Sequence, residues 1–87
     1  MERSLATIAR EIRTDWKPVS QHAEPYLRAM FSLSRITDPY YLDSGLTVVL
    51  YFLSNASAWR GDKAKAIKAE LKTMVKSTGY KLGLSSA

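Results

Sequence analysis

Apolar residues recur at helical spacing in four segments of the chain. The first set repeats every three or four residues and comprises Leu5, Ile8, Ile12 and Trp16. This spacing lines one face of a helix that turns by about 100° per residue. Ser4 is a candidate N-cap, and Lys17-Pro18 is expected to end the helix because proline disfavours helical geometry in the residue before it. The pattern predicts a helix over residues 4–16.

The second segment is a helix expected over residues 22–34. Its shared face comprises Tyr26, Leu27, Met30 and Ser34. Pro25 is tolerated only within the first turn, where its missing N–H is not needed. The linker after this helix contains Asp38-Pro39, a turn-opening pair, and a short helical turn is one conformation open to residues 39–42.

The third segment, residues 46–53, reads LTVVLYFL and suits either a strand or a helix. Three observations favour a helix over 44–57. A helical stripe runs through Leu46, Val49, Leu50 and Leu53. Asp43 or Ser44 supplies a cap, and the chain holds no second run that would pair with a lone strand. Because this helix is apolar on nearly every side, we expect it to be the most buried.

The fourth segment predicts an amphipathic helix over residues 62–78. Its apolar side comprises Ala64, Ile67, Leu71, Met74 and Val75. Asp62 is a candidate N-cap, and Gly79 is expected to stop the helix because glycine adopts the left-handed conformation at low cost. Residues 80–87 are rich in small residues and are expected to form a frayed tail.

Four helices with short connections predict an all-α fold, a small single-domain four-helix bundle spanning residues 1–87. The longest apolar run, residues 48–53, is too short to span a bilayer, so no membrane association is expected. The chain lacks cysteine, which excludes disulfides and thiolate chemistry and fits the cytoplasm.

Charge is distributed unevenly along the chain. Residues 60–87 hold seven basic and two acidic residues, whereas residues 1–59 hold six of each, so the net charge of +5 belongs to the last third. The candidate anion- or nucleic-acid-binding residues are Arg60, Lys63, Lys65, Lys68, Lys72 and Lys76. Such a strip suits phosphate, an anionic membrane surface or an acidic protein face. The alternative is a solvated outer face that keeps a small protein soluble.

The candidate partner-binding residues lie near the turns and comprise Tyr40, Tyr41, Trp59 and Arg60. Trp and Arg are enriched in interface hot spots. Two alternatives stay open at this point. Trp59 either closes the core at the turn between the third and fourth helices or anchors a partner. Tyr40 and Tyr41 either form a recognition surface or divide, with one packed over the core edge and the other hydrated.

The sequence offers no constellation of catalytic or metal-binding residues. It contains no Gly-rich phosphate loop, no G-x-S-x-G elbow and no Cys/His spacing for zinc, and its carboxylates are scattered singly. His22 could act as a ligand or a base, but as the sole histidine without such neighbours it is interpreted as a helix-start residue. We therefore expect a protein that is not an enzyme and needs no cofactor.

Three segments carry a resemblance to a known family: SLATIAREIRTDWK (4–17), AEPYLRAM (23–30) and YFLSNASAWRGDKAKAIKAELKTM (51–74). The most specific part is YFLSNASAWRGD followed by KAELK. The chain resembles small helical proteins encoded by bacterial phages, plasmids and related mobile elements. The resemblance implies an accessory protein of a mobile element that acts in the bacterial cytoplasm by binding a host or element-encoded macromolecule. No biochemical function is attached to that family, so no functional residue carries over.

Three functional hypotheses follow. The first is an interaction module that binds a host or element-encoded protein. The second is sequence-independent nucleic-acid binding through the basic C-terminal helix, which lacks the Arg, Asn and Gln residues usual in base readout. The third is a homodimer that completes a larger helical bundle, which is compatible with either of the others.

Overall fold

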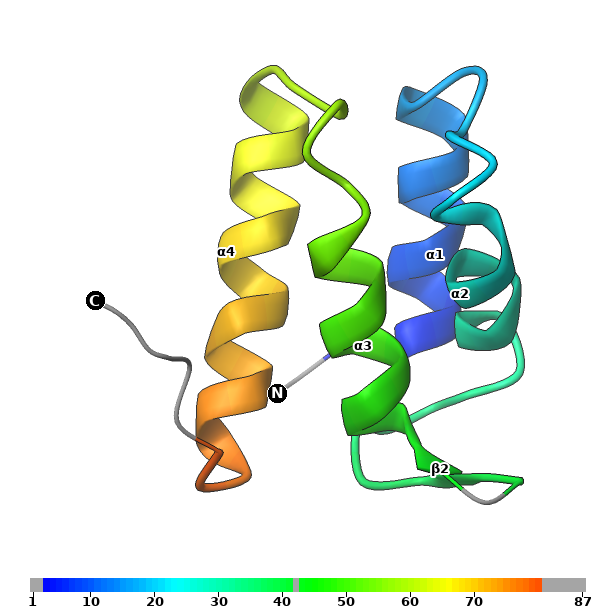
Figure 1. Cartoon of the computed structure of the whole chain (residues 1–87). Helices are drawn as coiled ribbons and strands as arrows, with labels where there is room; N and C mark the ends of the chain where they lie inside the picture. Colours follow the sequence, from blue (N-terminus) through cyan, green and yellow to red (C-terminus); the bar gives the residue numbers. More distant parts are fainter. Residues whose placement is uncertain (1–2, 42, 81–87) are drawn as a thin grey trace.

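The computed structural model describes residues 3–41 and 43–80. In this part of the chain four helices form a ring in which each packs against the next: α1 (Leu5–Asp15), α2 (Glu24–Met30), α3 (Gly45–Ser54) and α4 (Asp62–Ser77). A short hairpin, β1 (Pro39–Tyr40) and β2 (Asp43–Ser44), lies between α2 and α3. Figure 1 shows α4 along one side of the bundle and α2 along the other.

The first helix forms as the periodicity predicts. Ser4 is its N-cap, and the Ser4 hydroxyl accepts a hydrogen bond of 3.1 Å from the backbone N–H of Thr7. The apolar stripe faces inward, so that Leu5, Ile8 and Ile12 are fully buried. Trp16 follows the last turn as the C-cap and is itself buried.

The second helix is shorter than the predicted range of 22–34. It begins at Glu24 with Pro25 in its first turn, as expected, but ends at Met30. Beyond it the carbonyls of Leu33 and Ser34 accept the N–H groups of Ala6 and Leu5 at 3.0 and 2.9 Å. The first N–H groups of a helix lack partners within that helix. The segment after α2 therefore leaves helical geometry and supplies acceptors to the start of α1.

The hairpin corrects the pure all-α prediction and the helical turn considered for residues 39–42. Pro39 pairs with Ser44 and Tyr40 with Asp43 in antiparallel register. Tyr41 adopts a positive φ of 54° in the turn. Leu42 lies outside the described residues. The prediction of a mostly helical domain with four helices is confirmed, but the described residues also contain a two-stranded sheet of two residues per strand.

Residues 46–53 are helical, so the strand alternative is wrong and the helix is confirmed, although α3 ends at Ser54 rather than at residue 57. Ser44 occupies the N-cap position but makes no side-chain capping bond. The buried face is centred on Val48, Val49 and Phe52, whereas three leucines of the predicted stripe, Leu46, Leu50 and Leu53, are only partly buried. The helix is therefore rotated relative to the expected stripe.

The basic helix α4 matches its predicted range closely, and all five residues of its predicted apolar side are buried. Gly61 rather than Asp62 occupies the N-cap position, and no side chain caps this end. Gly79 follows the helix with φ of 90°, as expected for a stop. Of the predicted tail, residues 81–87 lie outside the described residues.

Candidate interaction surfaces

Trp59 is part of the core. Its side chain is 2% exposed, and its indole stacks on that of Trp16 with ring centroids 5.8 Å apart and an angle of 8° between planes. Phe52 meets both rings edge-on. The indole N–H of Trp59 donates to a carboxylate oxygen of Asp15 at 2.8 Å. Because the ring faces inward and its polar atom is already bonded, Trp59 closes the core and its assignment as a partner anchor is corrected.

Lys68 is held against Trp59. Its Nζ donates a 2.7 Å hydrogen bond to the backbone carbonyl of Trp59 and lies 5.8 Å from the centroid of the indole ring. Burial lowers the pKa of the Lys68 ammonium, and the nearby positive charges of Lys72 and Arg60 lower it further. Lys68 therefore stabilises the turn before α4 and is a weaker candidate for binding an external anion than the sequence suggests.

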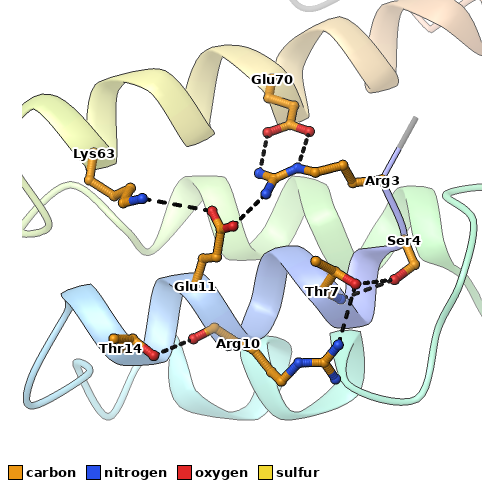
Figure 2. A network of polar contacts seen from close by, with 8 residues as sticks. All are labelled: Arg3, Ser4, Thr7, Arg10, Glu11, Thr14, Lys63 and Glu70. Carbon is orange, nitrogen blue, oxygen red and sulfur yellow. Dashed lines mark hydrogen bonds and ion pairs between the residues drawn. The ribbon is translucent and has the colours of Figure 1, made fainter. Parts of the chain in front are cut away.

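Lys63 faces an ion-pair network between α1 and α4 (Figure 2). Arg3 bridges the two helices, with a bidentate pair to Glu70 at 2.7 and 3.0 Å and a 2.6 Å contact to Glu11. Lys63 approaches the other oxygen of Glu11 at 4.0 Å. The hydrogen bond from Arg3 lowers the pKa of Glu11, and the bonds to Glu70 and Glu11 raise that of Arg3. This network neutralises Glu11 and Glu70, the carboxylates between α1 and α4.

Four of the predicted cations remain available on the outer side of α4. They are exposed, make no ion pair among the residues described, and comprise Arg60, Lys65, Lys72 and Lys76. The last three lie within one helical face, together with the exposed and small residues Ala69 and Thr73. We call these four cations the basic face; the nearest exposed carboxylate on α4 is that of Asp62, three residues before Lys65.

A second surface gathers tyrosines from three separate elements. We call it the tyrosine groove; it has a volume of about 510 Å³ and is lined by Pro25, Tyr26, Ala29, Tyr40, Asp43, Thr47, Val48 and Tyr51. The rings of Tyr26 from α2 and Tyr51 from α3 stack with centroids 5.4 Å apart. Tyr40 enters from the hairpin. The groove therefore lies where α2, α3 and the hairpin meet, at the end of the bundle where Figure 1 shows the hairpin.

Tyr41 lies next to the groove and, at 89%, is the most exposed large hydrophobic residue among those described. Its ring meets that of Tyr40 edge-on, with centroids 4.7 Å apart. The expectation that one tyrosine of this pair packs on the core edge while the other stays hydrated is confirmed, with Tyr40 packed and Tyr41 exposed. Sequence reasoning did not single out Tyr26 and Tyr51 as candidates. Tyr26 was assigned to the shared face of the second helix, and Tyr51 lies in a helix that was expected to be the most buried.

Asp43 is the only charged residue that lines the tyrosine groove. It is exposed and makes no ion pair within residues 3–41 and 43–80. The groove is therefore apolar on its walls and acidic at one edge, in a protein whose net charge is +5. Its electrostatic character is opposite to that of the basic face.

A more polar hollow of about 380 Å³ lies near the C-terminal end of α4, and its lining includes Arg3, Arg35, Ser77 and Thr78. The hydroxyls of Ser77 and Thr78 donate to carbonyls of their own helix at 2.6 and 2.7 Å, and Arg3 is engaged by two glutamates. The negative end of the helix dipole also opposes an anion here. Among the described residues, Arg35 is the only cation in the lining that is not engaged by a carboxylate, so the hollow is a weak candidate for an anion site.

Within the described residues, no three His, Cys, Asp or Glu side chains come close enough to hold a metal ion. His22 is exposed in the turn before α2, two residues ahead of the helix start. No helix of this part of the chain combines the length and apolar character needed to cross a membrane. Comparison with protein families, curated proteins and solved structures finds no match to this chain. The resemblance to mobile-element proteins stays a prediction.

Proposed function

We propose that the protein is a non-enzymatic binding module whose tyrosine groove, together with Tyr41, docks a partner protein. The observation that carries the proposal is the convergence of Tyr26, Tyr40 and Tyr51 on one hollow, with Tyr41 exposed beside it. Tyrosine is enriched at interfaces because its ring supplies contact area while its hydroxyl tolerates water in the free protein. The groove tyrosines replace Trp59 as the proposed anchors.

The proposed setting follows the family resemblance. The protein would serve a phage or another mobile element in the bacterial cytoplasm and bind a host or element-encoded protein. The basic face would then assist encounter, since fixed charges outside a contact raise association rates more than they raise affinity. Arg60 belongs to this steering role, because it is exposed at the start of α4 and lies outside the groove lining.

The test is capture of partners from bacterial lysate by the full chain at low and high salt. The informative bait is a Tyr41→Ala/Tyr51→Ala double variant, and the matched control is Tyr80→Ala, because Tyr80 is 46% exposed but does not line the groove. We expect a partner that the wild type and the control retain at both salt concentrations and the folded double variant loses. Retention of every partner by the double variant would refute the proposal.

A second candidate function is sequence-independent nucleic-acid binding through the basic face. It is favoured by four exposed cations that lack carboxylate partners in the described chain: Arg60, Lys65, Lys72 and Lys76. Each phosphate that a lysine neutralises contributes about −0.9 to the slope of log affinity against log salt concentration, so four contacts predict a slope of roughly −3 to −4. Anisotropy titrations of duplex DNA measure this slope.

The matched pair for this test is Lys72→Gln against Lys17→Gln, since Lys17 is exposed just beyond the C-terminal end of α1 and does not belong to the basic face. Loss of Lys72 should reduce the slope by about one, and loss of Lys17 should leave it unchanged. Absence of any DNA or RNA binding at low salt would exclude this function.

Self-association is compatible with both functions, and a monomer in sedimentation at high concentration would exclude it.

A further inference from the structure

The tyrosine groove has walls and a floor of different character. Its walls are the rings of Tyr26, Tyr40 and Tyr51, with Pro25 among them, and its floor holds the small side chains of Ala29 and Val48. We propose that this groove binds an extended, proline-containing segment of a partner protein with an arginine or lysine next to the prolines. This inference rests on the proposed function and specifies the chemistry of the partner.

The ring arrangement favours proline over other apolar residues. Tyr26 and Tyr51 stack on each other with 27° between their planes, so the two elements present one continuous aromatic surface to the groove. Aromatic-lined grooves of this kind accept polyproline II segments, which are preformed and lose little entropy on binding. A proline also carries no N–H, so pressing it against an aromatic wall leaves no donor unpaired. The tyrosine hydroxyls and Thr47 remain to donate to the free carbonyls of such a segment.

Two other modes of peptide recognition fit the groove less well. A helical partner needs a hydrophobic groove with room for side chains at i, i+3, i+4 and i+7. Here the aliphatic lining is limited to Pro25, Ala29, Val48 and the methyl of Thr47. Addition of a strand needs a sheet edge, and β1 and β2 are only two residues long. A partner in extended polyproline conformation needs neither feature.

The charge of Asp43 favours a basic residue next to the prolines of the partner segment. Asp43 is the only charged residue in the lining and makes no ion pair within the described parts of the chain, so its carboxylate is available to a cation. The same charge repels phosphate, which separates this site from the basic face and disfavours a nucleic acid as its occupant. An arginine beside the prolines would reach Asp43 while the proline rings contact the tyrosines.

The test is a titration of the ¹⁵N-labelled full chain with an acetylated, amidated peptide of eight prolines followed by one arginine. Backbone amide shifts map the site directly and do not depend on any variant. We expect shifts at Tyr26, Thr47 and Tyr51 and none along the outer side of α4. Two control peptides keep the length: one replaces the prolines by alternating glycine and serine, and the other replaces arginine by glutamate. Both should bind at least about fivefold more weakly.

Variants then test the two contacts separately. Tyr51→Ala should weaken binding about tenfold and Asp43→Asn about threefold, whereas Tyr80→Ala should leave it unchanged. Asp43→Asn should also abolish the preference for arginine over glutamate. Tyr51→Phe keeps the ring and should retain most of the affinity, so it reports on the groove even if the alanine variant is unstable.

Several results would overturn the inference. These are no shifts at millimolar peptide, equal binding of the glycine–serine peptide, or shifts confined to α4. If the proline peptide fails while capture from lysate still depends on Tyr41 and Tyr51, the protein-binding function stands and the proline chemistry is wrong. If capture is also independent of these tyrosines, both proposals fail.

Discussion

Substitution of Gly45 tests how closely the start of α3 packs against residues 35–38, the linker that precedes the hairpin. Gly45 is buried as the first residue of α3, and its N–H donates to the carbonyl of Asp38 at 2.8 Å. A Cβ at this position would lie 2.8 Å from the carbonyl oxygens of both Arg35 and Ile36. These neighbours are backbone atoms, which cannot rotate away as a flexible side chain would. The Gly45→Ala substitution therefore forces the linker and the helix apart.

Two opposing contributions determine the size of the effect. Alanine is a better helix former than glycine by up to about 1 kcal/mol, and less at a first helical residue. Overpacking of a closely packed site costs about 1–3 kcal/mol. We expect overpacking to dominate, with a net loss of about 1–2 kcal/mol in the free energy of unfolding. For a domain of this size each kcal/mol lowers the melting temperature by about 4–8 °C.

Thermal and urea unfolding, followed by circular dichroism, measure this loss. Ala69→Gly serves as the matched control, because Ala69 is exposed on α4 and its replacement changes helix propensity alone, at a cost of about 1 kcal/mol. A Gly45→Ala variant as stable as the wild type would refute the close approach of α3 to residues 35–36. The linker also leads into the hairpin, so the same variant should weaken binding at the groove by displacing Tyr40.

Three further predictions concern the stability of the fold. Ser4→Ala removes the side-chain cap of α1 and should cost about 1 kcal/mol in urea unfolding. Asp15→Ala leaves the indole N–H of Trp59 without its acceptor and should cost a similar amount, about 1 kcal/mol, with the tryptophan fluorescence of the folded protein altered. Hydrogen bonds from arginines lower the pKa of Glu11 and Glu24 below the ordinary value of 4.5, so the ionised carboxylates stabilise the folded state above that pH. Stability should therefore fall as the pH is lowered through the folded-state pKa values, and a flat profile between neutral pH and pH 3 would contradict the ion pairs.

The helices were predictable where the sequence is periodic and capped. Ser4 and the apolar stripe of α1 define that helix locally. Helix α4 ends two residues before Gly79, whose positive φ is the conformation expected of a glycine that stops a helix. The end of α2 was not predictable in the same way. It depends on the N–H groups of Leu5 and Ala6, which need acceptors from a segment almost thirty residues further along the chain. The sequence of α2 and the residues next to it therefore contains no pattern that predicts where α2 ends.

The interaction surfaces were predictable only in part. The lysine spacing on α4 anticipated the exposed cations, but the position of Lys68 over the carbonyl of Trp59 follows from the turn at Gly61, whose conformation the spacing does not report. The groove joins Tyr26, Tyr40 and Tyr51 from three elements, so its existence depends on how α2 packs against α3. The one feature of the sequence that pointed to the groove was the tyrosine within the apolar run of α3. A buried tyrosine hydroxyl needs a hydrogen-bond partner, which favours exposure of this residue, and Tyr51 is indeed 52% exposed.

The placement of the aromatic residues explains how a chain of 87 residues keeps an apolar groove open. A domain of this size buries only about 60% of its unfolded surface, so most large apolar side chains are needed inside. Trp16, Phe52 and Trp59 meet that need by packing on one another, and the indole N–H of Trp59 is bonded to Asp15. Tyr51 is then left 52% exposed, and Tyr26 and Tyr40 are only partly buried against the core. Their hydroxyls keep them compatible with water, and their rings remain available to lose that water only when a partner arrives.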